Sequence, residues 1–156
     1  MLTVEGQPSG LGWLPDGDLL VVSMRDHRIL RRSADGSVSV HAELSEYCGG
    51  HLNDMVVSAD GRAYVGNFGF DLMAFADPVP AALVRVDPDG TATVVAEDLL
   101  FPNGSVITPD GRTLIDQAVA LASGGDETTF EDLSGTWTEL GSQLDEAATA
   151  AQARAR

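Results

Sequence analysis

Three polar residues stand close together just before an apolar run: His51, Asn53 and Asp54. An imidazole can transfer protons in a hydrolysis, and amide and carboxylate oxygens can bind a hard cation or a polar substrate. Asn103, in a Pro-Asn-Gly segment, is a further amide of this kind. Structural alternatives stay open, because Asn often satisfies backbone groups in turns, His51 fits a polar loop, and Asp54 could close a turn or cap a strand.

Asp-Gly turns between β-prone runs predict the elements that position these residues. Five hairpins are expected, over residues 11–23, 28–40, 54–66, 82–95 and 105–115. Asp-Gly is typical of a two-residue hairpin turn in which both residues have φ > 0. The aspartates of three turns, Asp16, Asp60 and Asp110, are therefore expected to shape turns rather than to bind metal.

The hairpins alternate in type, so two hairpins, or four short strands, make one repeat. A repeat of roughly 40–50 residues with four strands is typical of a β-propeller blade. The first blade is predicted over residues 8–44 and the second over 53–99, and the third begins near Asn103 and stops at Ile115. The fold predicted for residues 1–115 is all-β: a partial β-propeller of about two and a half four-stranded blades. Its open blade edges favour self-association.

Other residues are assigned to packing or to the surface. Trp13, Phe68 and Phe70 are expected between blades, and His27 and His41 on the surface. Residues 116–156 form an acidic, Ala-rich tail without hairpin signals, and an apolar stripe within 136–156 predicts a helix. This tail is expected either to cap the open blade edge or to lie outside the fold.

The composition limits the partners of the chain. Its net charge is −15, with Lys+Arg 9 against Asp+Glu 24. This charge argues against binding to nucleic acid or to an anionic membrane surface. Cys48 is the single cysteine, so no intrachain disulfide is expected, and a structural thiol in a reducing, cytoplasmic setting fits. No signal peptide and no membrane span of about 20 apolar residues is expected.

Three stretches of the sequence resemble the SMP-30/gluconolactonase/LRE family. They are residues 8–17, 51–72 and 101–114, in the order and at the spacing of that family. The resemblance implies a six-bladed propeller that hydrolyses a small, sugar-type lactone with the help of a divalent cation, Ca²⁺ or Zn²⁺. It further implies that Asn103 is a metal ligand and that Asn53 and His51 contact the substrate.

The sequence departs from the family pattern at the two acidic metal ligands. Ser9 stands where the family has a Glu, with Glu5 nearby but out of register, and the family's later Asp would lie beyond Ile115. Asp54 is the candidate substitute carboxylate. The chain therefore resembles an internal fragment of the ring. Two hypotheses follow: an impaired metal-dependent lactonase, or an inactive arc that serves as a binding or self-association module.

Overall fold

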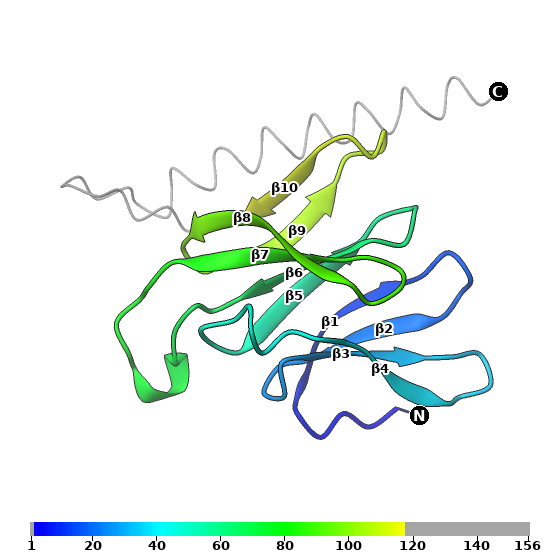
Figure 1. The fold of residues 1–156 in the computed structure, drawn as a ribbon, viewed down its shortest axis with the longest axis horizontal. Coiled ribbons are helices and arrows are strands. Elements are labelled where there is room, and N and C mark those ends of the chain that lie inside the picture. The colour runs from blue at the N-terminus through cyan, green and yellow to red at the C-terminus, as the bar shows by residue number, and fades with distance from the viewer. Residues whose placement is uncertain (1, 118–156) are drawn as a thin grey trace.

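All five predicted hairpins are present, and they join into two four-stranded antiparallel sheets and one two-stranded sheet (Figure 1). The computed structural model describes residues 2–117. The first sheet contains β1 (Pro8–Trp13), β2 (Leu19–Ser23), β3 (Arg28–Arg32) and β4 (Val38–Glu43). The second contains β5 (Leu52–Val57), β6 (Ala63–Asn67), β7 (Ala81–Val86) and β8 (Ala92–Leu99). The third contains β9 (Asn103–Ile107) and β10 (Leu114–Gln117), and a short 3₁₀ helix, η1 (Leu72–Ala74), precedes β7.

The sheets stack through their first strands. β1 lies beside β5, and β5 lies beside β9, so these three strands form a seam (Figure 1). The last strands, β4 and β8, lie at the opposite edges of their sheets from β1 and β5. The turns that end β1, β5 and β9 lie on the same side of the molecule, at the right of Figure 1. This arrangement is that of neighbouring propeller blades, so the predicted partial β-propeller is confirmed.

The Asp-Gly turns differ from the two-residue form that the sequence predicted. Only their glycines have positive φ, at +90° for Gly17, +86° for Gly61 and +70° for Gly111. In the first turn, the amide of Gly17 donates to the carbonyl of Leu14 at 2.9 Å, and the amide of Leu14 donates to Asp18 at 2.9 Å. This pattern is a four-residue turn followed by a glycine bulge. The aspartate still shapes the turn, because a carboxylate oxygen of Asp16 accepts from the amide of Asp18 at 3.1 Å.

One hydrophobic core fills the space between the first two sheets. Its buried residues are Leu14, Leu20, Val22, Ile29, Ala42 and Leu44 from the first blade and Leu52, Met55, Ala63, Val65, Val84 and Val86 from the second. Glycines let β1 and β5 approach closely. A Cβ on Gly10 would lie 2.4 Å from the backbone nitrogen of Met55, and one on Gly12 would lie 2.3 Å from a methyl group of Val57.

Two of the three aromatic residues expected between blades are placed there. Phe68, directly after β6, stacks on Phe101 with ring centroids 4.6 Å apart, and the ring centroid of Phe70 lies 6.1 Å from that of Phe101. These rings join the second blade to the segment before β9. The prediction for Trp13 was wrong: it is 63% exposed, because no element within residues 2–117 covers the outer face of β1.

The remaining expectations concern the end of the chain and membranes. β10 extends to Gln117, past the predicted end of the hairpin at Ile115. The helix predicted within residues 136–156 lies outside the described residues. In the described part of the chain, no helix is long and apolar enough to cross a membrane.

Candidate functional site

The polar residues singled out in the sequence lie where the first strands of the blades begin. His51 directly precedes β5, Asn53 is the second residue of β5, and Asn103 is the first residue of β9. Since β5 and β9 lie side by side and their following turns share one side of the molecule, their first residues share the opposite side (Figure 1). The fold therefore brings Asn53 and Asn103 to the same end of the neighbouring strands β5 and β9.

Asn53 links the two strands directly. Its side chain is buried, with the residue only 3% exposed, and Nδ2 donates to the carbonyl oxygen of Pro102 at 2.7 Å. Its other atom, Oδ1, is buried and has no hydrogen-bond partner among the described residues. Gly66 makes room for this arrangement, because a Cβ there would lie 2.5 Å from Oδ1 of Asn53 and 2.4 Å from the Pro102 carbonyl oxygen.

A pair of histidine rings lies beside this seam. The ring centroid of His51 is 6.3 Å from that of His27 and 6.2 Å from that of Phe68. His27 is half-buried rather than on the surface as predicted, and its Nε2 is enclosed without a partner among residues 2–117. Burial lowers the pKa of His27, the neighbouring His51 lowers it further, and Asp26 opposes both effects. Sequence reasoning missed this pair, because it depends on how the loop before β3 meets the start of β5.

Asp54 and Asn103 are half-buried, and neither makes a side-chain hydrogen bond to another described residue. Ser9, which the sequence resemblance places where the family has a Glu, lies near the start of β1 and carries no carboxylate. Within residues 2–117, no three His, Cys, Asp or Glu side chains are placed to hold one metal ion. The described seam therefore offers mainly neutral amide groups, together with the Asp54 carboxylate.

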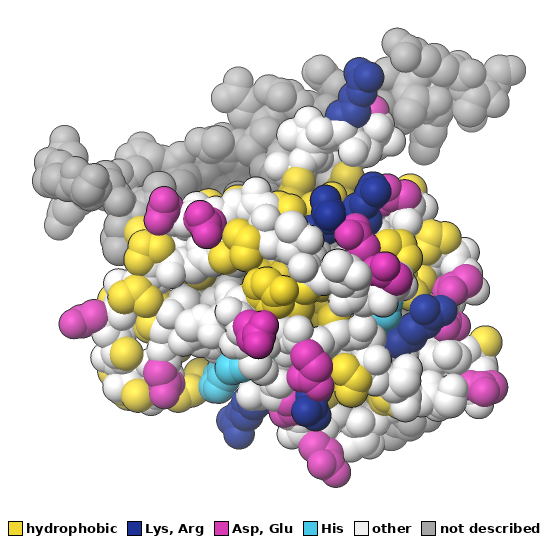
Figure 2. Space-filling view, viewed as in Figure 1, with side chains coloured by type: hydrophobic (Ala, Val, Ile, Leu, Met, Phe, Trp, Pro, Cys, Tyr) yellow, Lys and Arg dark blue, Asp and Glu magenta, His cyan; other side chains and the backbone are white. Residues whose placement is uncertain are grey.

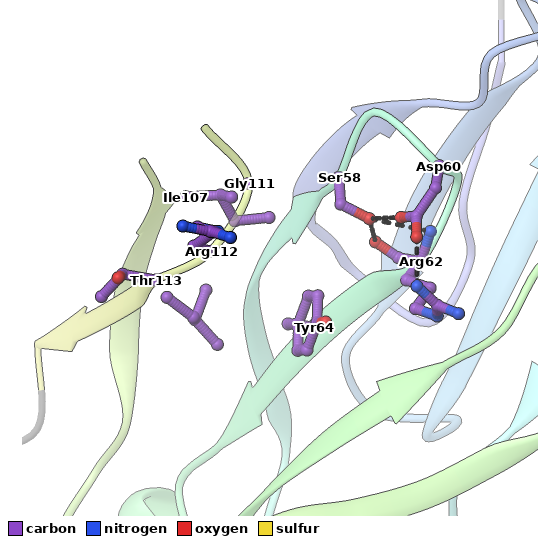
Figure 3. A pocket seen from close by; sticks show the side chains of 9 residues that line it. Ser58, Asp60, Arg62, Tyr64, Ile107, Gly111, Arg112 and Thr113 are labelled. Atoms are coloured by element: carbon purple, nitrogen blue, oxygen red, sulfur yellow. Dashed lines mark hydrogen bonds and ion pairs between the residues drawn. The ribbon is translucent and has the colours of Figure 1, made fainter. Parts of the chain in front are cut away.

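A pocket of about 170 Å³ lies at the opposite end of the second blade (Figure 3). Its lining includes Ser58 and Arg62 near the β5–β6 turn, Tyr64 of β6, and Arg112 at the β9–β10 turn. Figure 3 shows that Tyr64 and Arg112 face the gap between the two hairpins, whereas Ser58, Asp60 and Arg62 bond to one another. The length of β5, at roughly 3.3 Å per residue, separates this pocket from Asn53. It therefore contains none of the predicted site residues.

Acidic side chains outnumber basic ones in the chain as a whole. Figure 2 shows acidic side chains spread over the visible face, with basic side chains at fewer places. This agrees with the net charge of −15 for the whole chain. An uncharged polar molecule approaches such a surface without the repulsion that an anion would meet.

Comparisons with known proteins give a family and a fold. A family model described as "SMP-30/Gluconolactonase/LRE-like region" matches residues 2–119. Among curated proteins, none matches the sequence. A solved structure assigned as a gluconolactonase is similar with a TM-score of 0.59 and 19% identity, over 74% of this chain and 42% of that one.

Two lyases of known structure also share the fold. A streptogramin B lyase has a TM-score of 0.52 and 16% identity, over 71% of this chain and 34% of its own. Virginiamycin B lyase from Staphylococcus aureus has a TM-score of 0.51 and 17% identity, over 70% of this chain and 35% of its own. The chain thus spans less than half the length of each of these three proteins, and at these identities the likeness concerns the fold alone.

Proposed function

The chain belongs to the SMP-30/gluconolactonase/LRE-like family, and from that premise we propose that it takes part in the binding and hydrolysis of a small, sugar-type lactone. The proposed site is the end of the seam where β5 and β9 begin. Asn53 and His51 would contact the lactone, and Asn103 would lie beside it. The residues of the far pocket are not part of this proposal.

The observation that carries the proposal is the state of the Asn53 side chain. Its Nδ2 is committed to the Pro102 carbonyl, which fixes the orientation of the amide. Its Oδ1 remains buried without a partner among the described residues. Buried polar atoms are nearly always hydrogen-bonded, so this acceptor suits a hydroxyl group of a bound molecule or a bridging water. A sugar-type lactone carries such hydroxyl groups next to its ester bond.

The divalent cation implied by the family does not fit the described residues by themselves. A hard cation such as Ca²⁺ takes six to eight oxygen ligands, including carboxylates that offset its charge. Asn103 would supply one neutral oxygen, and Asp54 is the one nearby carboxylate on β5. If Ca²⁺ or Zn²⁺ serves this chain, Asn103 would be one ligand, and further carboxylates would have to come from outside residues 2–117.

The shortage of carboxylate ligands favours a second candidate function, in which the partial propeller binds the lactone without hydrolysing it. Ester hydrolysis requires an activated water, supplied by a metal or by a general base. Asn53 and Asn103 cannot accept a proton at neutral pH, which leaves the two histidines, His27 and His51, and Asp54 as the bases near the seam. We therefore expect binding to survive under conditions in which hydrolysis is slow or absent.

One pair of assays separates the two functions. Proton release from gluconolactone, above its spontaneous rate, would be followed in EDTA and after addition of Ca²⁺ or Zn²⁺. Binding of a non-hydrolysable sugar lactam would be followed by calorimetry in the same buffers. Metal-stimulated hydrolysis that falls in Asn103→Ala supports the lactonase; saturable lactam binding without hydrolysis supports the binding module. Absence of both would overturn the proposal.

A further inference from the structure

The outer face of the first blade is an apolar sheet surface that is exposed along β1 and β4, whereas Val21 of β2 is buried. Leu11 and Trp13 of β1 are 53% and 63% exposed. Residues paired directly across strands share a face of a sheet. The pairing therefore places two rows on this face: Leu11, Val21, Leu30 and Val40 in one, and Trp13, Leu19, Arg32 and Val38 in the other. Arg32 is the one charged residue in these rows, on a chain that is otherwise strongly acidic.

The second blade shows what normally covers such positions. Aligned on their Asp-Gly turns, Met55 and Val57 of β5 correspond to Leu11 and Trp13 of β1. Met55 is only 8% exposed, because it packs with Val57 against the first blade, where Gly10 and Gly12 leave no room for a Cβ. Leu11 and Trp13 therefore correspond to residues that pack on a neighbouring strand in the second blade. Within residues 2–117, no such strand lies against them.

We infer that the outer face of the first blade binds the β9–β10 end of a second copy of this chain. By the same alignment, β9 presents Gly104 and Val106 at the positions that Gly10 and Gly12 occupy in β1. Val106 is 37% exposed, so this side of β9 is also open among the described residues. Trp13 and Leu11 of one copy would then pack on β9 of the next, as β5 packs on β1 within one chain.

This contact joins unlike surfaces, and it therefore closes a ring or continues as a filament. The described residues of two copies would supply six sheets, with strands enough for about five full blades. Propellers of four to eight blades are known, so a closed dimer is the expected product. Each copy carries a net charge of −15, which opposes association at low ionic strength. Because salt screens repulsion between exposed charges, association is expected to strengthen as salt is added.

The test is the mass of the full chain in solution by light scattering, over a range of protein and salt concentrations. We expect a shift from the 16.3 kDa monomer to the dimer as either concentration rises. Trp13→Glu and Val106→Glu should each remain monomeric, whereas Val79→Glu, at an exposed valine in the loop before β7, should associate like the unaltered chain. Circular dichroism would establish that each variant is folded.

Mixing the two monomeric variants tests the geometry of the contact. The intact Trp13 face of Val106→Glu should bind the intact β9 of Trp13→Glu, which gives a complex of two chains and nothing larger. A Trp137→Phe chain offers a second measurement that needs no surface variant, because Trp13 emission should shift to the blue on association. A mixture that stays monomeric, a chain that is monomeric under all conditions, or a Val79→Glu chain that fails to associate would each overturn the inference. Permanent monomers would point instead to coverage of this face by residues 118–156.

Discussion

The side-chain amide of Asn53 donates a hydrogen bond of 2.7 Å to the carbonyl oxygen of Pro102, and so joins the start of β5 to the start of β9. This bond spans two blades. It also fixes the side-chain amide of Asn53 against Pro102, the residue that precedes Asn103. The family resemblance predicts that Asn103 binds the metal. The same contact can therefore be tested as a structural link and as part of the proposed site.

Replacing Asn53 by Ala should weaken the attachment of the third hairpin. The Pro102 carbonyl is buried and would lose its partner, at a cost of about 1–3 kcal/mol in the free energy of unfolding. Hydrogen exchange should accelerate most at the amides of β9. Asn67→Ala is the matched control, since Asn67 bonds to Ala82 and Gly69 within the second blade. Equal acceleration in β9 for both variants would contradict the link.

A side chain at position 66 should disturb the same contact from the other side. The Cβ of Gly66→Ala would lie within 2.5 Å of both Asn53 Oδ1 and the Pro102 carbonyl oxygen, so strands must shift. Overpacking of this kind costs about 1–3 kcal/mol in stability. Urea unfolding of Gly66→Ala, Asn53→Ala and the double variant would measure it. Because the two residues touch, the effects should be less than additive; simple additivity would argue against a shared site.

Protonation of His27 should destabilise the fold as the pH falls. Burial and the neighbouring His51 lower its pKa in the folded state, so the unfolded chain, with a pKa near 6.5, binds the proton more tightly. The stability tied to neutral His27 is thus fully present above the unfolded pKa. It declines as the pH drops below about 6.5 and levels off below the folded pKa.

The variant His27→Gln would isolate this contribution. Melting temperatures between pH 8 and pH 5 should fall less for the variant than for the unaltered chain. Some dependence will remain, because burial also lowers the pKa of His41. Identical pH profiles for the two proteins would remove His27 as the cause.

Cys48 should be unreactive in the folded protein. Its Sγ donates to the carbonyl of Leu44 at 2.7 Å, and burial raises the pKa of the thiol to about 12. Thiolate is the reactive form, so almost none is present at neutral pH. Alkylation by iodoacetamide at pH 7.5, followed by mass spectrometry, should be at least tenfold slower in buffer than in denaturing urea. Comparable rates would show that the thiol is accessible, contrary to the structural role predicted from the sequence.

Much of the fold was predictable because it rests on local signals. The Asp-Gly turns predicted where the hairpins lie, and the repeat length predicted that pairs of hairpins form blades. The turn type was not predictable, because Asp-Gly also fits a turn with a glycine bulge, in which only Gly17 or its equivalents need positive φ. The exposure of Trp13 was missed for a different reason: an apolar alternation marks a packing face but does not say whether its neighbour is present.

The candidate site was predictable only in part. The motifs around Asn53 and Asn103 identified both residues, and the stacking of β5 on β9 places them at one end. The bond from Asn53 to Pro102, the need for glycine at position 66, and the pairing of His27 with His51 all depend on contacts between blades. No spacing along the chain encodes those contacts. The roles of His51, Asp54 and Asn103 stay predictions until ligand binding is measured.

The most direct test of the proposed site is an NMR titration of the full chain with a non-hydrolysable sugar lactam, following the side-chain amides of asparagine. We expect saturable shifts of the Asn53 and Asn103 signals, with the Asn67 signal unchanged as an internal control. Saturable shifts confined to residues around Tyr64 and Arg112, or no saturable shift at all, would contradict it.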